Sequence, residues 1–238
     1  LCETSVLDSA MGQSVQEMVM ERFDWRSAGI TLESLMRSYA FRPSKNRRRF
    51  VAEGDHPDER IVFVPPRIHP ILPIYETTED YLRHLPLELS EHLVLLVRSG
   101  HAALGLGTVD ELRDVKVIRK YMIRKGQGVA QETLDSKKRV SSGGSQLRRR
   151  ETTKFFQEIS KELHLRSRQI ALCQNLFVAT PVRLWPQVFK TKPKPPFISD
   201  DNRVVRLALD IKTPNRESLE AFNEQLGLGY WAVESPAG

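Results

Sequence analysis

The sequence predicts an α/β protein in which helices pack on a mixed β-sheet. Two short apolar runs, residues 93–98 and 102–107, flank Ser99-Gly100 and predict a β-hairpin. Residues 115–124 alternate apolar and polar side chains, which predicts a third, antiparallel strand. Helical and strand-like segments then alternate toward the C-terminus, as is typical of the α/β class.

The segments after residue 146 have recognisable periods. Phe155, Phe156, Ile159 and Leu163 share one side of a helix expected over residues 147–163. The expected order continues with a strand over 169–178, a short helix over 184–189, a strand over 204–211 and a helix ending at Leu226. Thr213-Pro214 supplies an N-cap and a first-turn proline for that last helix.

An N-terminal helical extension is expected over residues 1–50, ahead of an α/β domain over residues 51–238. Apolar residues recur every three to four positions over 14–41, beginning with Val15, Met18 and Val19. Pro43 and a basic cluster at 45–49 end this pattern. In the larger domain, residues 61–64 predict a short buried strand and residues 78–84 a helical turn.

Composition limits the possible classes of protein. The chain has 238 residues, of which 40% are hydrophobic and 28% charged, as in ordinary globular domains. Its apolar runs are strand-sized, so no membrane partner is expected. Cys2 and Cys173 cannot form a disulfide framework, and the start at Leu1 shows no signal pattern. We therefore expect a trimmed chain from a cytoplasmic protein.

Positive charge is concentrated in one part of the chain. The net charge is +6, yet residues 113–154 hold thirteen basic and four acidic residues, which leaves −3 for the rest. A basic band on a mildly acidic body is typical of proteins that bind a polyanion, most often nucleic acid. A solvated loop between charged strand faces is the alternative.

A long polar segment over residues 125–146 is the strongest functional signal. Unstructured loops of this length inside a compact domain are usually functional or disordered. It contains Gly128 and Gln131 near its start and Gln146 at its end. Glycine allows a close backbone approach to a ligand, and a glutamine amide can orient a water or a carbonyl without titrating. The alternative is a flexible, solvated loop.

Basic residues surround this loop and are the candidate RNA-binding residues. They are Arg124, Lys125, Lys137, Lys138, Arg139, Arg148, Arg149 and Arg150. The last three fall in the first turn of the expected helix, where the macrodipole disfavours cations. A phosphate bound across the helix start would explain them, and side chains extended into water are the alternative.

Other catalytic templates find little support. The six histidines show no HExxH pairing, and the chain has no GxSxG motif, so no metal and no cofactor are expected. Cys173 is expected to be a core residue in a strand. Asp110, Asp114 and Asp210 leave open a metal-dependent nuclease, although nothing in their spacing supports it.

Residues 119–151 resemble the release-factor-like domain of the Vms-type ribosome quality-control proteins, which are related to the eukaryotic and archaeal class I peptide chain release factors. The resemblance consists of a basic strand ending at Lys125, a GxxQ motif at residues 128–131, a polar spacer, and Ser-x-Gly-x-x-Leu-Arg-Arg over residues 142–149 followed by Glu151. Residues 91–211 follow the element order of that domain, so the resemblance implies a fold like a release-factor central domain.

The resemblance implies a domain that enters the peptidyl-transferase centre and frees stalled nascent chains from peptidyl-tRNA. The bond would be either the peptidyl ester or a phosphodiester near the tRNA acceptor end. Gln131 corresponds to the functional glutamine, within the motif that Gly128 begins, and Gln146 is the second candidate. The implied partners are the large ribosomal subunit, its rRNA and peptidyl-tRNA, with no DNA.

The two reactions need different things from the loop. Ester hydrolysis needs a positioned water and a donor for the oxyanion, whereas RNA cleavage needs an activated 2′-hydroxyl and compensation of phosphate charge. Because no histidine lies in the loop, either reaction would depend on positioning and on RNA groups. A non-catalytic ribosome- or RNA-binding module is the alternative.

Overall fold

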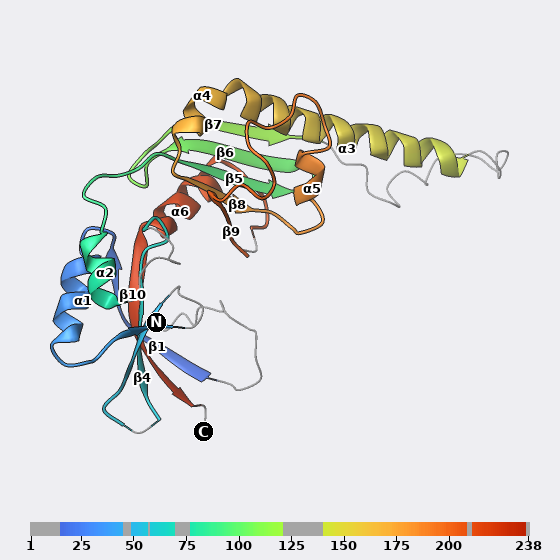
Figure 1. Cartoon of the computed structure of the whole chain (residues 1–238). Coiled ribbons are helices and arrows are strands. Elements are labelled where there is room, and N and C mark those ends of the chain that lie inside the picture. Colours follow the sequence, from blue (N-terminus) through green and yellow to red (C-terminus); the bar gives the residue numbers. More distant parts are fainter. Residues whose placement is uncertain are drawn as a thin grey trace. The chain divides into compact units, whose positions relative to one another are not determined.

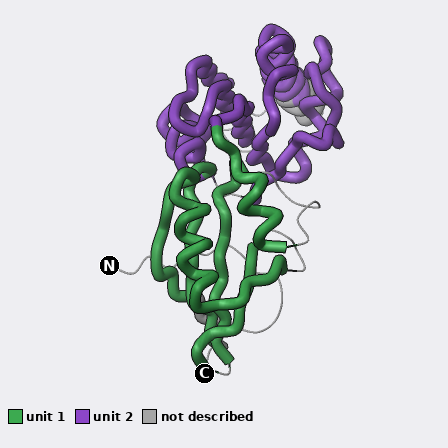
Figure 2. The backbone as a smooth tube through the Cα atoms, turned by 60° about the vertical axis from the view of Figure 1, so that its left-hand side comes forward, with its two compact units in different colours: residues 1–87, 226–238 green, residues 88–225 purple. Residues whose placement is uncertain are grey.

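The computed structural model of the chain describes residues 15–44, 49–56, 58–69, 77–120, 140–208 and 211–236. The chain forms two compact units, shown in Figure 2: residues 1–87 with 226–238, and residues 88–225. Each unit is built on its own five-stranded sheet. The division falls after Leu87, whereas the sequence analysis placed a boundary between residues 50 and 51.

The unit formed by residues 88–225 contains a mixed sheet, which confirms the predicted class. Its strands are β5 (His92–Arg98), β6 (His101–Gly107), β7 (Leu112–Arg119), β8 (Asn175–Ala179) and β9 (Val204–Arg206). They lie in the order β7-β6-β5-β8-β9. The hairpin β5–β6 and the pair β6–β7 are antiparallel, as predicted, while β8 runs parallel to β5 and β9.

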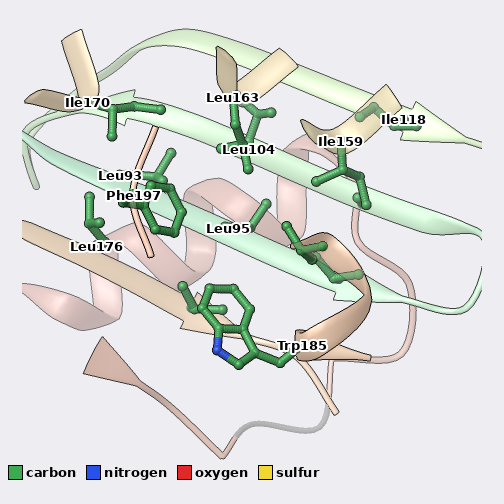
Figure 3. Packing of buried hydrophobic residues seen from close by; sticks show 14 of the residues in the cluster. Leu93, Leu95, Leu104, Ile118, Ile159, Leu163, Ile170, Leu176, Trp185 and Phe197 are labelled. Carbon is green, nitrogen blue, oxygen red and sulfur yellow. The ribbon is translucent and has the colours of Figure 1, made fainter. Parts of the chain in front are cut away.

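Helix α3 (Val140–Leu165) covers one face of this sheet (Figure 1). Ile159 and Leu163 of α3 lie fully buried over Leu104 and Ile118, as Figure 3 shows. α4 (Ser167–Leu172) and α5 (Trp185–Val188) follow it, and Trp185 joins the same core. The helical spacing of apolar residues in the sequence thus predicted the buried side of α3 correctly.

Helix α6 (Arg216–Leu226) covers the opposite face. A Cβ atom on Gly105 would lie 2.9 Å from methyl groups of both Leu112 and Leu219, so a larger residue there would require these side chains to move. His92 and Asn223 are buried and form a hydrogen bond of 2.7 Å between Nε2 and Oδ1. This bond ties the start of β5 to α6.

The other unit contains an antiparallel sheet built from distant parts of the chain. Its strands are β1 (Val15–Asp24), β2 (Arg42–Pro43), β3 (Phe50–Glu53), β4 (Arg60–Val64) and β10 (Leu228–Pro236), in the order β1-β10-β4-β3-β2. α1 (Ala28–Met36) and α2 (Thr78–Arg83) complete it. Phe23, Phe50, Phe63 and Tyr81 form an aromatic core.

The expected N-terminal helical extension is wrong. Residues 15–24 form strand β1, and α1 is the only helix among the described residues before position 50. The apparent helical spacing is misleading because Met18 and Val19, which contribute to it, are exposed, and among residues 18–24 only Phe23 is buried. Its partner is β10 at the far end of the chain, so no local pattern identifies the pairing.

Several boundaries also differ from expectation. Residues 167–172 are helical rather than the start of a strand, since Ile170 faces the core while Leu172 is exposed. The strand expected over 204–211 ends at Arg206. The cap of α6 is Asn215, whose Oδ1 accepts the Ser218 backbone N–H at 2.7 Å, rather than Thr213.

Candidate functional site

The structure describes only part of the predicted site. Gly128, Gln131 and five of the basic candidates fall in residues 121–139, outside the described residues; the five are Arg124, Lys125, Lys137, Lys138 and Arg139. Gln146 and Arg148 belong to α3, with only their backbone described. Arg149 and Arg150 also belong to α3, and both of their side chains are exposed to solvent.

Helix α3 begins earlier than expected, which changes the position of Arg148, Arg149 and Arg150 within the helix. The helix starts at Val140, so residues 140–146 of the predicted loop are helical. Residues 148–150 therefore lie in the third turn, not the first. The helix macrodipole acts mainly on groups in the terminal turn. Arg149 and Arg150 thus lie as exposed cations along the helix rather than in an anion site at its N-terminus.

Ion pairs fasten α3 to the edge strand β7. Lys116 Nζ lies 3.5 Å from Glu162 Oε1, and Lys120 Nζ lies 2.8 Å from Glu158 Oε2. The hydrogen bond and charge of Glu158 raise the pKa of Lys120. These contacts hold the C-terminal half of α3 beside β7.

Arg166 completes this network at the end of α3. Its Nε and Nη2 donate to the two carboxylate oxygens of Asp114, both at 2.9 Å, and its Nη1 donates to Glu162 Oε2 at 2.6 Å. The guanidinium is only 14% exposed, so these bonds are largely shielded from water. The arrangement is a bidentate clamp between β7 and α3.

The ion pairs reduce the charge of the basic band. Lys116 and Lys120 are paired with glutamates of α3, Lys154 with Glu151 at 2.9 Å, and Arg113 with Glu91. Glu158 and Glu162 lie just beyond residues 113–154, so the net charge of that stretch does not include the glutamates that pair with its lysines. Among the described residues of the band, no ion pair is found for Arg119, Arg149 or Arg150. These exposed arginines are the part of the band that remains available for an anion.

Two of the residues weighed for other chemistry, Cys173 and Asp114, have structural roles, and Asp210 lies outside the described residues. Burial raises the pKa of the Cys173 thiol to about 11, so it is not a thiolate nucleophile. Cys173 follows α4 rather than lying within a strand. The Asp114 carboxylate is occupied by Arg166. In the described part of the chain, no three His, Cys, Asp or Glu residues are grouped as a metal site would require.

None of the helices described here is both long and apolar enough to cross a membrane.

Comparisons with known proteins place this arrangement in a family. Among solved structures, the chain is similar to the "Vms1 mitochondrial localization core", with a TM-score of 0.44, 10% identity, and coverage of 84% of this chain and 80% of that one. It is also similar to Pelota from Archaeoglobus fulgidus, with a TM-score of 0.31, 11% identity, and coverage of 94% and 68%. No curated protein matched.

A sequence model of the Bacteroidetes VLRF1 release factor family matches residues 92–228. The match begins at the first residue of β5 and runs through α6, so it takes in the mixed sheet, α3 and the GxxQ segment. It covers more than half of the 238 residues. The chain therefore belongs to the Bacteroidetes VLRF1 release factor family.

Proposed function

We propose that this chain acts on the ribosome as a release factor that frees stalled nascent chains from peptidyl-tRNA through its GxxQ segment. The observation that carries the proposal is the family match over residues 92–228, which includes Gly128 and Gln131. The platform described above supports it, because that segment joins β7 to α3, whose C-terminal half is buried against and ion-paired with the sheet. The proposed partners are the large subunit, its rRNA and peptidyl-tRNA.

Gln131 is the proposed functional glutamine, and the helix start favours it over Gln146. Gln146 lies in the second turn of α3, where its backbone is committed to helical geometry. Gln131 precedes the helix, in the motif that Gly128 opens. A glutamine amide can both donate to a developing oxyanion and accept from a water, so it suits ester hydrolysis by positioning.

The arginines of α3 supply the proposed contacts to the acceptor end. Arg149 and Arg150 are exposed and have no carboxylate partner among the described residues. A guanidinium binds phosphate in a bidentate manner, which suits either holding the tRNA or compensating charge during cleavage of its backbone. Arg148 and the basic residues at 124, 125 and 137–139 are proposed to extend this contact.

The test uses stalled large subunits that carry labelled peptidyl-tRNA. Gln131→Ala should abolish release while leaving subunit binding unchanged, and Gln146→Ala should retain release. The 3′ end of the recovered tRNA then identifies the bond, because ester hydrolysis leaves it intact and endonucleolytic cleavage shortens it.

Each contrary outcome points to one alternative. Loss with Gln146→Ala alone would assign the function to the second glutamine. Binding without release by the wild-type chain would indicate a non-catalytic RNA-binding module. Loss of a ribosome-independent cleavage on adding EDTA would indicate a metal-dependent nuclease.

A further inference from the structure

The solvent side of α3 carries polar residues at regular helical spacing. Four of them stand four, three and four positions apart, so they share one face of the helix. They are Arg150, Lys154, Gln157 and Lys161, and all four are exposed. The opposite face carries Phe155, Ile159 and Leu163, which are buried against the sheet. The outer face of α3 therefore presents three cations and one amide, of which only Lys154 has an acidic partner, Glu151.

Two acidic residues of α3 are paired with cations outside the outer face. Glu158 bonds to Lys120 and Glu162 to both Lys116 and Arg166. A third acid, Glu151, is paired with Lys154 and offsets that one cation of the outer face. Lys161 has no ion pair with any described residue.

A second segment adds another cation beside this face. Thr191 is 8% exposed, and its Oγ1 lies 2.8 Å from Ser160 Oγ and 3.3 Å from the Phe156 carbonyl oxygen, which anchors the segment to α3. The next residue, Lys192, is exposed and lines the same surface hollow as Lys161. The hollow is lined by Gln157, Glu158, Lys161, Glu162, Lys192 and Pro193.

We propose that this basic stripe, defined as Arg150, Lys154, Lys161 and Lys192, binds the phosphate backbone of RNA. The proposal rests on the proposed function, and it adds a contact surface separate from the GxxQ segment. At a rise of 1.5 Å per residue, the stripe extends about 16 Å from Arg150 to Lys161, which is long enough to reach successive phosphates. Lysines bind phosphate as point charges and position a protein on a backbone without reading sequence.

The composition of the stripe favours RNA over an acidic protein. Protein–protein contacts are built around a buried centre with few charges and many aromatic residues. The stripe has no apolar side chain at its three helical positions, and Gln157 between them adds only a hydrogen-bonding amide. An evenly charged row of this kind matches a polyanion of repeating charge.

The test compares three variants of the full chain over a range of KCl concentrations. Lys161→Gln/Lys192→Gln removes two cations from the stripe, Arg37→Gln/Lys212→Gln removes two exposed cations elsewhere, and Lys161→Arg/Lys192→Arg keeps the charge. Binding is measured to large subunits carrying peptidyl-tRNA and, separately, to free deacylated tRNA. The first variant should lower the slope of log K against log [salt] by about two, since each phosphate contact contributes about one.

The control and the arginine variant should keep the wild-type slope. A lowered slope with free tRNA would place the stripe on tRNA, and a lowered slope with subunits alone would place it on rRNA. An unchanged slope in both assays, or an equal change in the control, would overturn the proposal. If Lys161→Gln/Lys192→Gln also weakens binding to ribosomal proteins from which the RNA has been removed, the proposal is overturned, and the partner is an acidic protein.

Peptide release at saturating protein separates this proposal from the proposed function. If the slope does not change but Gln131-dependent release persists, only the stripe is wrong. If the slope falls as expected and the wild-type chain releases no peptide, the release mechanism is wrong and the stripe stands.

Discussion

The two sheets of this protein are assembled in opposite ways. In the unit of residues 88–225, β5, β6 and β7 follow one another along the chain, and helices cover both faces of the sheet. In the other unit, β10 comes from the C-terminus and lies between β1, from the N-terminus, and the central strand β4. The first sheet thus suits a platform for a functional segment, whereas the second closes only when both ends of the chain meet.

The cores differ in the same sense. The core between α3 and its sheet consists mainly of aliphatic side chains from five strands and several helices. The other core depends on a few aromatic rings, with Phe23 stacked on Phe63 at 4.9 Å between centroids and Phe50 lying 5.1 Å from Tyr81. We therefore expect a single truncation to damage the aromatic core more than it damages the platform.

The largest effect is expected for Phe63→Ala. Phe63 is fully buried and contacts Phe23, Phe50 and Tyr81, so its truncation should lower the free energy of unfolding by about 3–5 kcal/mol. Hydrogen exchange should show lost protection in β3, β4 and β10, with β5 and β6 still protected. Met20→Ala, at a residue that is 49% exposed, is the control. Equal loss of protection in both sheets would show that the units unfold together.

A pH effect also originates in the aromatic unit. His69 is 2% exposed and lies 2.6 Å from the Tyr81 hydroxyl through Nδ1, and its burial lowers its pKa to about 4. The unfolded chain takes up this proton near pH 6.5, so stability is complete above that pH and falls as the pH drops toward 4. At about 1.4 kcal/mol per unit, the loss approaches 3 kcal/mol over this range.

The histidine titration can be measured directly by NMR. The ring signals of His69 should not shift appreciably between pH 7 and 5. His69→Gln removes the ionisable group and should flatten the dependence of stability on pH over the same range. A midpoint for His69 above pH 6 would contradict the assignment.

The difference between the sheets also explains what the sequence could predict. Residues 93–98 and 102–107 are neighbours joined by a two-residue turn, so a local pattern was sufficient to identify their pairing. The pairing Val15↔Pro236 joins opposite ends of the chain, and the exposed apolar residues Met18 and Val19 made the spacing of β1 look helical. Period and turn chemistry act over a few residues, so they cannot report a partner at the other end.

The site shows the same limit in its charges. The exposed arginines at 149 and 150 could be predicted because they are consecutive in a helix of recognisable period. The ion pairs of Lys116 and Lys120 with glutamates of α3 could not be predicted, because they depend on how that helix docks against β7. Lys192 reaches the stripe only through the anchoring of Thr191 on Ser160, a contact between distant segments.

The smallest effect distinguishes shielded from exposed ion pairs within the platform. Arg166→Met removes the bidentate bond to Asp114 and the bond to Glu162 while keeping an apolar stem, so the free energy of unfolding should fall by about 2 kcal/mol. Arg216→Met removes an analogous i,i+4 pair with Glu220, whose side chains are 70% and 52% exposed. That control should change stability by less than about 0.5 kcal/mol, because solvent screens exposed pairs.

Urea denaturation of both arginine variants provides the comparison. Equal losses would mean that the clamp between β7 and α3 contributes no more than a surface pair. If Arg166→Met is the more destabilised variant, the clamp holds α3 in place. In that case we also expect the Arg166→Met variant to release peptide more slowly at temperatures where it remains folded, because α3 directly follows the segment that carries Gln131.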